Sequence, residues 1–336
     1  MTSNYFEIIH AKGHASIQDL GRLNAQHLGF SASGAADEYA FLTANQLISR
    51  NLQLDPVKQS SCAAIEITLG QLTLRAQASC TIAITGADCQ ASINNTVIDN
   101  WQCHQLSRGD ILAFAMPKSG LHSYLAIKGG FSCQAKQQPW LGSLAQTQNE
   151  MPLGFTGNPL TLGSKLYFIA QPASQTPTRQ QSVKHDINFY ATEQLTLRFM
   201  ANPLFLKMSA RQQQTFFATD YVISADSNRM GYRLKPKAKN ITATPAPILS
   251  SALRQQCLLS MPVTYGMVQL PANEQPIVLM KERQTMGGYP VLGTVMQTDL
   301  FRLSQMRPGA NVNFRLINPQ QAIQQLLAFY QKFNEL

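Results

Sequence analysis

The residues most able to do chemistry lie in one stretch, 277–290, where an apolar run turns polar without a break. Its polar part reads, in order, Lys281, Glu282, Arg283, Gln284, Thr285, Met286, Gly287, Gly288 and Tyr289. Because side chains alternate along an extended chain, Lys281 and Arg283 are expected on one face and Glu282 and Gln284 on the other. The glycine pair can present bare backbone N–H groups to an anion. A solvated strand end with an ordinary glycine turn has the same residue types, and this simpler reading stays open.

A second cationic cluster precedes this stretch. Arg229 and Arg233 are four residues apart, a spacing that places them on one face, with Tyr232 between them. Together with Lys281 and Arg283, these two guanidiniums predict a clamp for a carboxylate, phosphate or carboxyphosphate. A single arginine is more often a surface residue, so the prediction depends on several of them converging.

The first half of the chain offers a different kind of anion site. A small, flexible loop at 29–34, which includes Ser33 and Gly34, leads into a helix for which Asp37 is the expected N-cap. The glycine spacing from 29 to 35 is that of a P-loop, but alanine stands where the P-loop lysine is required. A tight turn that needs small residues explains the loop equally well.

Composition narrows the classes of partner. The chain has 336 residues, of which 44% are hydrophobic and only 13% charged, with a net charge of +9. No run of Lys and Arg and no basic stripe with interleaved aromatics is present, so we expect no nucleic-acid partner; a small anion or an acidic protein fits the positive charge. The N-terminal sequence has no signal-peptide pattern and no apolar stretch could cross a bilayer, which predicts a cytoplasmic protein without membrane contact.

The six cysteines show no CxxC pair and no regular spacing, so they are expected to be reduced thiols, mostly in the core. The nearest approach to a metal-ligand cluster is Cys103-His104 with His122. It lacks a carboxylate or second thiol at ligand spacing, and we predict no metal site.

Short strand-like segments, among them 64–68 and 111–114, are separated by Gly, Asn and Asp turns. They predict a mainly β chain, a barrel or sandwich rather than an α/β fold. A polar segment with two prolines suggests a linker at 173–186, between a first domain at 1–172 and a second at 187–317. Single helices are expected at 203–217 and 298–306. A C-terminal helix is expected at 318–336, with Asn318 as N-cap and an apolar stripe that docks on the chain's own core.

Seven short motifs, taken in order, identify the chain as similar to a known family. They are Gln18-Asp-Leu-Gly-Arg22, Ser33-Gly-Ala-Ala-Asp37, Glu66-Ile-Thr-Leu-Gly70, Ile84-Thr-Gly-Ala-Asp88, Tyr124-Leu-Ala-Ile-Lys-Gly-Gly130, Arg229-Met-Gly-Tyr-Arg-Leu234, and Gln275-Pro-Ile-Val-Leu with Arg283-Gln-Thr-Met-Gly-Gly-Tyr-Pro290. The chain resembles the carboxyltransferase A/B family, also called allophanate hydrolase subunit 2. Its bacterial members include the C-type subunit of 5-oxoprolinase and the KipA partner of the kinase inhibitor KipI.

This resemblance implies two tandem cyclophilin-like β-barrel domains with a few helices, working beside a smaller KipI-type protein and possibly an A-type subunit of 5-oxoprolinase. The implied activity is ATP-dependent hydrolysis of a small amide or lactam such as 5-oxoproline. ATP with Mg would act in the complex, with no cofactor bound covalently to this chain. Two other functions remain open, a non-catalytic KipA-like module that antagonises a kinase inhibitor, and a biotin-dependent carboxyltransferase of the urea or allophanate pathway. The chain has no Met-Lys-Met biotinylation motif, so the third would need a separate carrier.

From these clusters and the resemblance we expect the catalytic residues to be Asp37, Glu282 and Arg283. The residues expected to bind substrate or anion are Arg22, Ser33, Gly34, Arg229, Tyr232, Arg233, Lys281, Gln284, Thr285, Gly287, Gly288 and Tyr289. The sequence also departs from the family pattern. Leu144-Ala-Gln146 stands where the family has Arg-Ser-Thr, and Asn158 where it has Arg, which bears on the substrate.

Overall fold

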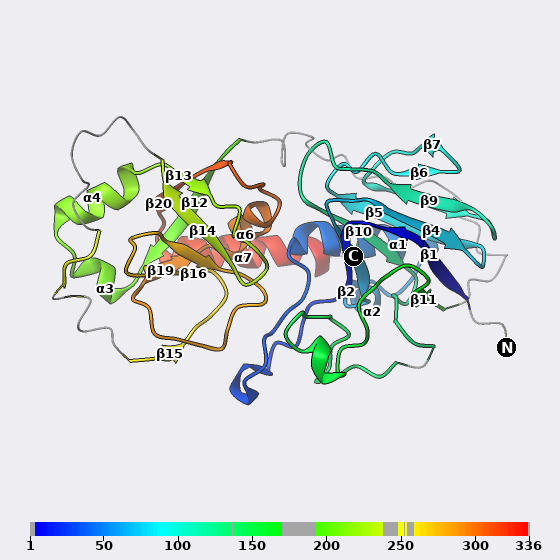
Figure 1. Cartoon of the computed structure of the whole chain (residues 1–336), viewed down its shortest axis with the longest axis horizontal. Helices are drawn as coiled ribbons and strands as arrows, with labels where there is room; N and C mark the ends of the chain where they lie inside the picture. Colours follow the sequence, from blue (N-terminus) through cyan, green and yellow to red (C-terminus); the bar gives the residue numbers. More distant parts are fainter. Residues whose placement is uncertain are drawn as a thin grey trace. The chain divides into compact units, whose positions relative to one another are not determined.

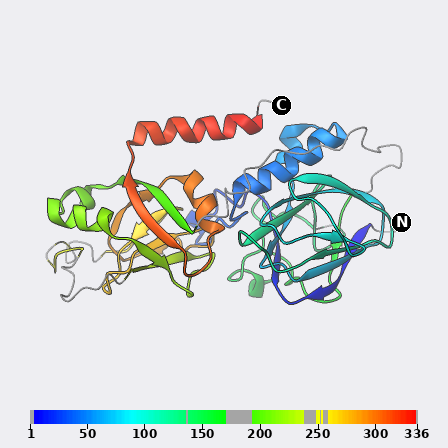
Figure 2. The ribbon, with the colours of Figure 1, turned by 90° about the horizontal axis from the view of Figure 1, so that it is seen from above.

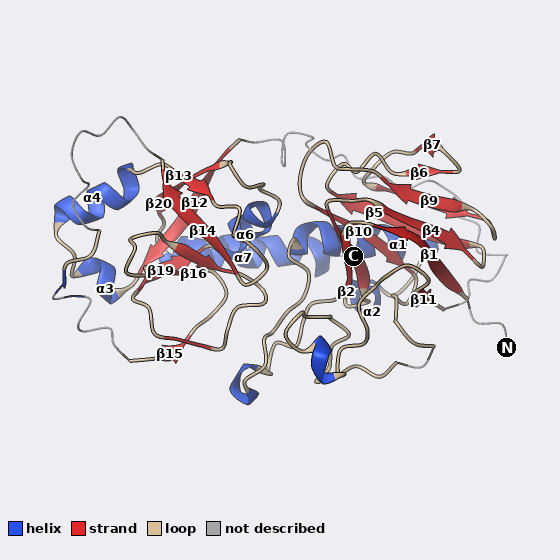
Figure 3. Cartoon of the chain, viewed as in Figure 1, coloured by secondary structure: helices blue, strands red, loops and turns tan. Residues whose placement is uncertain are grey.

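The computed structural model describes residues 4–135, 137–169, 193–237, 248–251, 253 and 259–334. It divides into two compact units (Figure 1). Unit 1 comprises residues 1–25, 32–191 and 330–336, and unit 2 comprises 26–31 and 192–329. The linker expected at 173–186 lies outside the described residues. Strands dominate both units (Figure 3), which confirms the prediction of a mainly β chain with a few helices.

Unit 1 contains two sheets. The first has the order β11-β1-β4-β9-β6-β7 and the second β2-β3-β10-β5-β8. The strands are β1 (Tyr5–Ala11), β2 (His14–Gln18), β3 (Ala64–Thr68), β4 (Leu72–Ala76), β5 (Cys80–Gly86), β6 (Ser92–Ile93), β7 (Thr96–Val97), β8 (Gln102–Leu106), β9 (Ile111–Phe114), β10 (His122–Ile127) and β11 (Lys165–Tyr167). One apolar cluster draws on both sheets, for example Phe6 and Leu74 from the first and Ile17 and Ile65 from the second. The two sheets therefore share a single core.

Helices α1 (Glu38–Leu52) and α2 (Pro56–Ser60) pack against each other on one side of the strands of unit 1 (Figure 2). α1 packs against β5, β8 and β10. Its apolar residues recur at helical spacing, and Ala40, Phe41, Ala44, Leu47 and Ile48 are all buried. Two short 3₁₀ turns are also described, η2 (Met151–Leu153) in unit 1 and η1 (Gln26–Leu28), which counts with unit 2.

Unit 2 is built on a closed barrel with the order β12-β19-β16-β17-β14-β13-β20. Its strands are β12 (Gln194–Ala201), β13 (Tyr221–Ile223), β14 (Gly231–Pro236), β16 (Met267–Gln269), β17 (Ile277–Leu279), β19 (Val291–Val295) and β20 (Asn311–Leu316), and β15 (Met261–Pro262) pairs with β18 (Met286–Gly287) outside it. β12 and β20 run parallel, with Arg198 opposite Arg315. Leu195, Leu197 and Phe199 point inward from β12 while the residues between them face outward. The inward set belongs to a core separate from that of unit 1.

Four helices of unit 2 are described, α3 (Pro203–Leu206), α4 (Ala210–Ala218), α6 (Gln297–Ser304) and α7 (Pro319–Asn334). The single helix expected at 203–217 is wrong, because Ser209 starts a new helix. Its side chain accepts from the backbone of Gln212, and the Gln212 side chain accepts from the Ser209 backbone. The C-terminal helix begins as expected, with the Asn318 side chain accepting from Gln320 N at 2.8 Å.

The apolar stripe of α7 is only partly buried. Ala322 is buried, but Ile323 and Leu327 are each 59% exposed, so only part of the stripe docks on the protein as expected. The last residues of the helix count with unit 1, where Tyr330 Oη donates to Glu38 Oε1 at 2.6 Å.

Candidate functional site

The polar stretch after β17 is held in place by an ion pair. Glu282 N donates to Arg229 O at 2.8 Å, so the stretch continues the pairing of β14 with β17. Arg229 Nε lies 2.5 Å from Glu282 Oε1, and the two side chains are only 13% and 6% exposed. The Arg229 guanidinium holds the buried carboxylate in one direction through a charge-assisted hydrogen bond. The pair joins a residue predicted to bind anion to one predicted to be catalytic.

The two cations of the stretch, Lys281 and Arg283, are also buried, and each contacts other residues of unit 2. Lys281 Nζ lies 4.9 Å from the ring centroid of Tyr265, a cation–π contact. Arg283 donates to Val263 O and Met280 O, each at 3.4 Å, and to Gln26 Oε1 at 3.2 Å. Burial lowers the pKa of Arg283, and the nearby Tyr265 opposes that shift. In this geometry the Arg283 guanidinium braces the loop, and its direct role in binding or catalysis stays a prediction.

A pair of side-chain amides lies against the glycine turn. Gln284 Nε2 is 3.5 Å from Gln269 Oε1, and Gln269 is 1% exposed. A Cβ on Gly287 would stand 2.5 Å from Gln269 Nε2, whereas one on Gly288 would meet nothing closer than Ser260 Oγ at 3.5 Å. A side chain at Gly287 would therefore displace the Gln269 amide, while Gly288 has room for a side chain. In the part of the chain that the structure describes, Gln269 Nε2 is buried without a hydrogen-bond partner.

Other residues predicted for this site differ in exposure. Tyr232 is buried, and its hydroxyl donates to Ser304 O at 2.9 Å inside the barrel. Arg233, the next residue along β14, points to the opposite side and is exposed. Tyr289 is 51% exposed, and Thr285 O accepts from Val263 N at 3.1 Å. Of the four cations predicted to form a clamp, Arg233 is exposed, Arg229 is partly buried against Glu282, and Lys281 and Arg283 are buried.

In unit 1, Asp37 is part of a buried network. Its Oδ1 accepts from Ala40 N at 3.1 Å, which caps α1, and its own N–H donates to Tyr124 Oη at 2.7 Å. Tyr124 Oη donates in turn to Glu66 Oε2 at 2.7 Å. Burial raises the pKa of Tyr124 well above its usual value, with the charges of Glu66 and Asp37 adding to the effect. Glu66 is a second buried carboxylate beside the Tyr124 hydroxyl. It belongs to the motif at 66–70, from which the sequence predicts no site residue.

Arg22, Ser33 and Gly34 hold the loop before α1. The Arg22 guanidinium carbon lies 4.9 Å above the Trp140 ring, and the group donates to Ala145 O. Ser33 has φ 54° and Gly34 φ +98°, and a Cβ on Gly34 would stand 2.9 Å from the Leu20 backbone. These contacts explain why the loop needs small residues, and anion binding by it stays a prediction.

The two segments that depart from the family pattern, 144–146 and residue 158, contact each other in unit 1. Gln146 Nε2 donates to Asn158 O at 2.8 Å, and Gln146 Oε1 accepts from Ile17 N at 2.9 Å. Leu144 N donates to Asp19 Oδ2 at 2.7 Å. The altered residues at 144–146 and 158 therefore form one packed substructure joined to β2.

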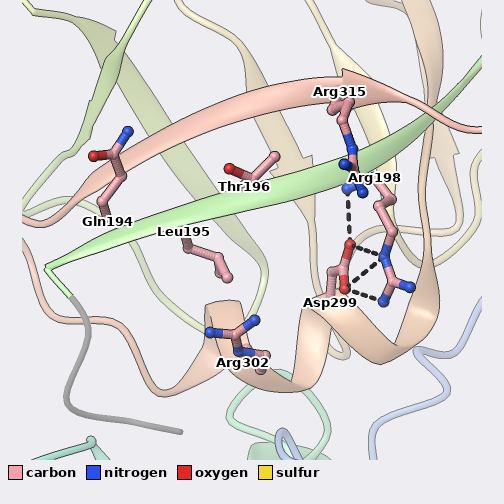
Figure 4. A pocket seen from close by; sticks show the side chains of 7 residues that line it. All are labelled: Gln194, Leu195, Thr196, Arg198, Asp299, Arg302 and Arg315. Atoms are coloured by element: carbon pink, nitrogen blue, oxygen red, sulfur yellow. Dashed lines mark hydrogen bonds and ion pairs between the residues drawn. The ribbon is translucent and has the colours of Figure 1, made fainter. Parts of the chain in front are cut away.

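A hollow of about 630 Å³ opens on the outside of the unit 2 barrel (Figure 4). Its lining consists of Gln194, Leu195, Thr196, Arg198, Asp299, Arg302 and Arg315. Sequence reasoning missed all of these residues, because they come from three separate segments and match no motif. Among the described residues, no group of three His, Cys, Asp or Glu side chains is placed to hold a metal ion. No described helix is long and apolar enough to cross a membrane.

Comparison with known proteins shows the family to which this chain of two β units belongs. The model of the family described as carboxyltransferase domain, subdomain A and B, matches residues 28–316, and the chain belongs to that family. It is 30% identical over 322 residues to the C-type subunit of 5-oxoprolinase from Escherichia coli, covering 94% of this chain and 93% of that protein. The protein of the same name from Haemophilus influenzae is 28% identical over 323 residues, covering 94% and 92%.

Larger proteins contain a similar region. The urea amidolyase of Lachancea kluyveri is 26% identical over 335 residues, which are 95% of this chain but 17% of that protein. The crystal structure of the K. lactis urea amidolyase matches all of this chain with a TM-score of 0.80 at 21% identity, over 20% of its own length. The structure of TTHA0988 matches 93% of this chain with a TM-score of 0.72 at 23% identity, so this chain spans 56% of it. At these identities the solved structures show the fold.

Proposed function

We propose that this chain is part of an ATP-dependent complex that hydrolyses a small cyclic amide, in the manner of a 5-oxoprolinase. The observation that carries the proposal is the match to the C-type subunit of 5-oxoprolinase, which extends over nearly the full length of both proteins. The urea amidolyase relatives are several times longer than this chain, so most of their length has no counterpart in the match.

The chemistry that such a reaction demands is activation of a resonance-stabilised amide. Phosphorylation of the lactam oxygen, or binding of the oxyanion that develops when water adds to the carbonyl carbon, lowers the barrier. Donors held in fixed positions suit either route. In unit 2, Glu282 is fixed by Arg229, and the buried amide of Gln269 offers an N–H group beside Gly287. Exposed Arg233 supplies a guanidinium that can reach a ligand carboxylate.

We further propose that the chain works with a KipI-type partner and a protein similar to the A-type subunit of 5-oxoprolinase. The sequence contains no nucleotide motif of the P-loop or dinucleotide type, so we expect the chain to have little or no ATP-dependent activity by itself. A stable complex should bury at least about 1,200 Å². Size-exclusion chromatography of an equimolar mixture at micromolar concentration should then give one joint peak with the KipI-type protein.

The test is reconstitution of the three proteins with 5-oxoproline and ATP, measuring glutamate and ADP. Turnover is expected with all three, and omission of this chain should abolish it. Turnover by this chain and ATP without partners would overturn the paired-subunit proposal. Binding of the KipI-type protein without turnover would favour the KipA-like module. Carboxylation of urea that needs bicarbonate and a biotinylated carrier, and that avidin stops, would favour the carboxyltransferase.

A further inference from the structure

The hollow on unit 2 gathers basic side chains around one opening. Gln194, Thr196 and Arg198 face outward from β12 at alternate positions, Arg315 comes from the neighbouring strand β20, and Asp299 and Arg302 lie on α6 (Figure 4). Its volume of about 630 Å³ falls within the range of small-molecule sites.

Two of the arginines stand directly opposite each other. Arg198 and Arg315 are register partners in the parallel pair of β12 and β20. Like charges at neighbouring positions destabilise a sheet unless something offsets them. Asp299 offsets one of the two charges. Its Oδ2 accepts from the backbone N of Arg198 at 2.7 Å and from Nε at 2.9 Å, and it raises the pKa of Arg198.

The remaining charge is positive. Three guanidiniums and one carboxylate line the hollow, so its formal charge is +2. Arg315 is exposed on β20 and Arg302 is partly exposed on α6, so two arginines from different elements line the hollow. Thr196 adds a hydroxyl and Gln194 an amide, both able to bond to oxygen.

We propose that this hollow binds the phosphate group of a small ligand, with Arg302 and Arg315 as its donors. A carboxylate carries one charge and two oxygens, which a single guanidinium fork satisfies. A phosphate monoester carries a charge of about −1.5 to −2 and three acceptor oxygens, so it matches two forks on separate elements and a site of charge +2. The size of the hollow leaves room for a body such as a nucleoside attached to the phosphate.

The experiment is isothermal titration of the full chain, without partners, against inorganic phosphate, pyrophosphate, ATP and adenosine. Saturable binding of at least one phosphate compound is expected, and Arg315→Gln and Arg302→Gln should each weaken it about tenfold or more. ATP binding more tightly than pyrophosphate, with no binding of adenosine, would identify a nucleotide. Equal affinities for ATP and pyrophosphate would identify a site for the phosphate group alone. The measurement is binding by this chain, so it does not depend on whether the complex hydrolyses 5-oxoproline.

Arg211→Gln is the matched control, because Arg211 is an exposed arginine of α4 in the same unit and lies outside the hollow. It should leave binding unchanged. An equal loss in this control would mean that only the net charge matters and would overturn the site. Absence of saturable binding at millimolar ligand, or full affinity in Arg315→Gln when that variant unfolds at the same temperature as the parent chain, would overturn it as well.

Discussion

Arginines that look alike in the sequence have different environments in the structure. Arg229 is nearly buried against Glu282, Arg283 is buried among backbone carbonyls, and Arg233 is exposed on β14. Residue types predicted the cluster of arginines. The burial and the partners of each arginine depend on the elements that its side chain faces in the fold. Replacing Arg283 therefore perturbs the loop as well as any ligand, which makes Arg233 the cleaner probe of function.

Arg229→Gln should lower stability, whereas Arg233→Gln should leave stability nearly unchanged and lower activity. Arg229→Gln leaves Glu282 buried without its guanidinium, which should lower the free energy of unfolding by about 3 kcal/mol. Arg233→Gln should change it by less than about 0.5 kcal/mol, because the side chain is exposed. If Arg233 binds a ligand carboxylate, the same change should reduce activity of the reconstituted complex about tenfold or more. Urea unfolding of both variants and the coupled assay measure this, and full activity in Arg233→Gln would place the site elsewhere.

At the scale of elements, hydrophobic periodicity predicted the positions of strands better than it predicted the contacts around them. The expected strands at 64–68 and 111–114 match β3 and β9 to the residue. β14 was missed as a strand because it begins with Gly231 and ends with Pro236, residues that signal turns. The break between α3 and α4 depends on the capping box of Ser209, which a helical pattern in apolar residues does not reveal.

The candidate sites show the same limit of prediction from local sequence patterns. The loop at 281–289 was predicted because its residues are contiguous, and the structure gives each of them a defined place. The hollow was not predicted because Arg198 and Arg315 meet through the parallel pairing of β12 with β20. Parallel strands are distant in sequence, and no local pattern reports which strands become neighbours.

Asp37 is both the cap of α1 and a predicted catalytic carboxylate, and two substitutions separate these roles. Asp37→Asn keeps an oxygen that can cap the helix, so stability should fall little, whereas Asp37→Ala should cost about 1 kcal/mol or more. If the carboxylate takes part in catalysis, both variants should lose activity. Thermal unfolding and the reconstituted assay decide between the roles. An active Asp37→Asn with an unstable Asp37→Ala would show that Asp37 is the helix cap and nothing else.

At the scale of the whole molecule, the chain forms two units with separate apolar cores. Leu74 on β4 belongs to the core of unit 1, and Leu197 on β12 belongs to the core of unit 2. Both side chains are fully buried. Each core is therefore a unit of stability in its own right, and the free energy of unfolding need not be a single quantity for the chain.

We expect calorimetry of the full chain to resolve two transitions, with a van't Hoff enthalpy below the calorimetric enthalpy. Leu74→Ala and Leu197→Ala remove equal volumes from the two cores, and each should cost about 2–5 kcal/mol in its own unit. For units of this size that corresponds to a fall of roughly 5–15 °C in one transition temperature, with the other transition left in place. The two variants serve as controls for each other. A single transition that shifts equally in both would show that the two cores unfold together, and the stability effects of all other substitutions would then be shared by the whole chain.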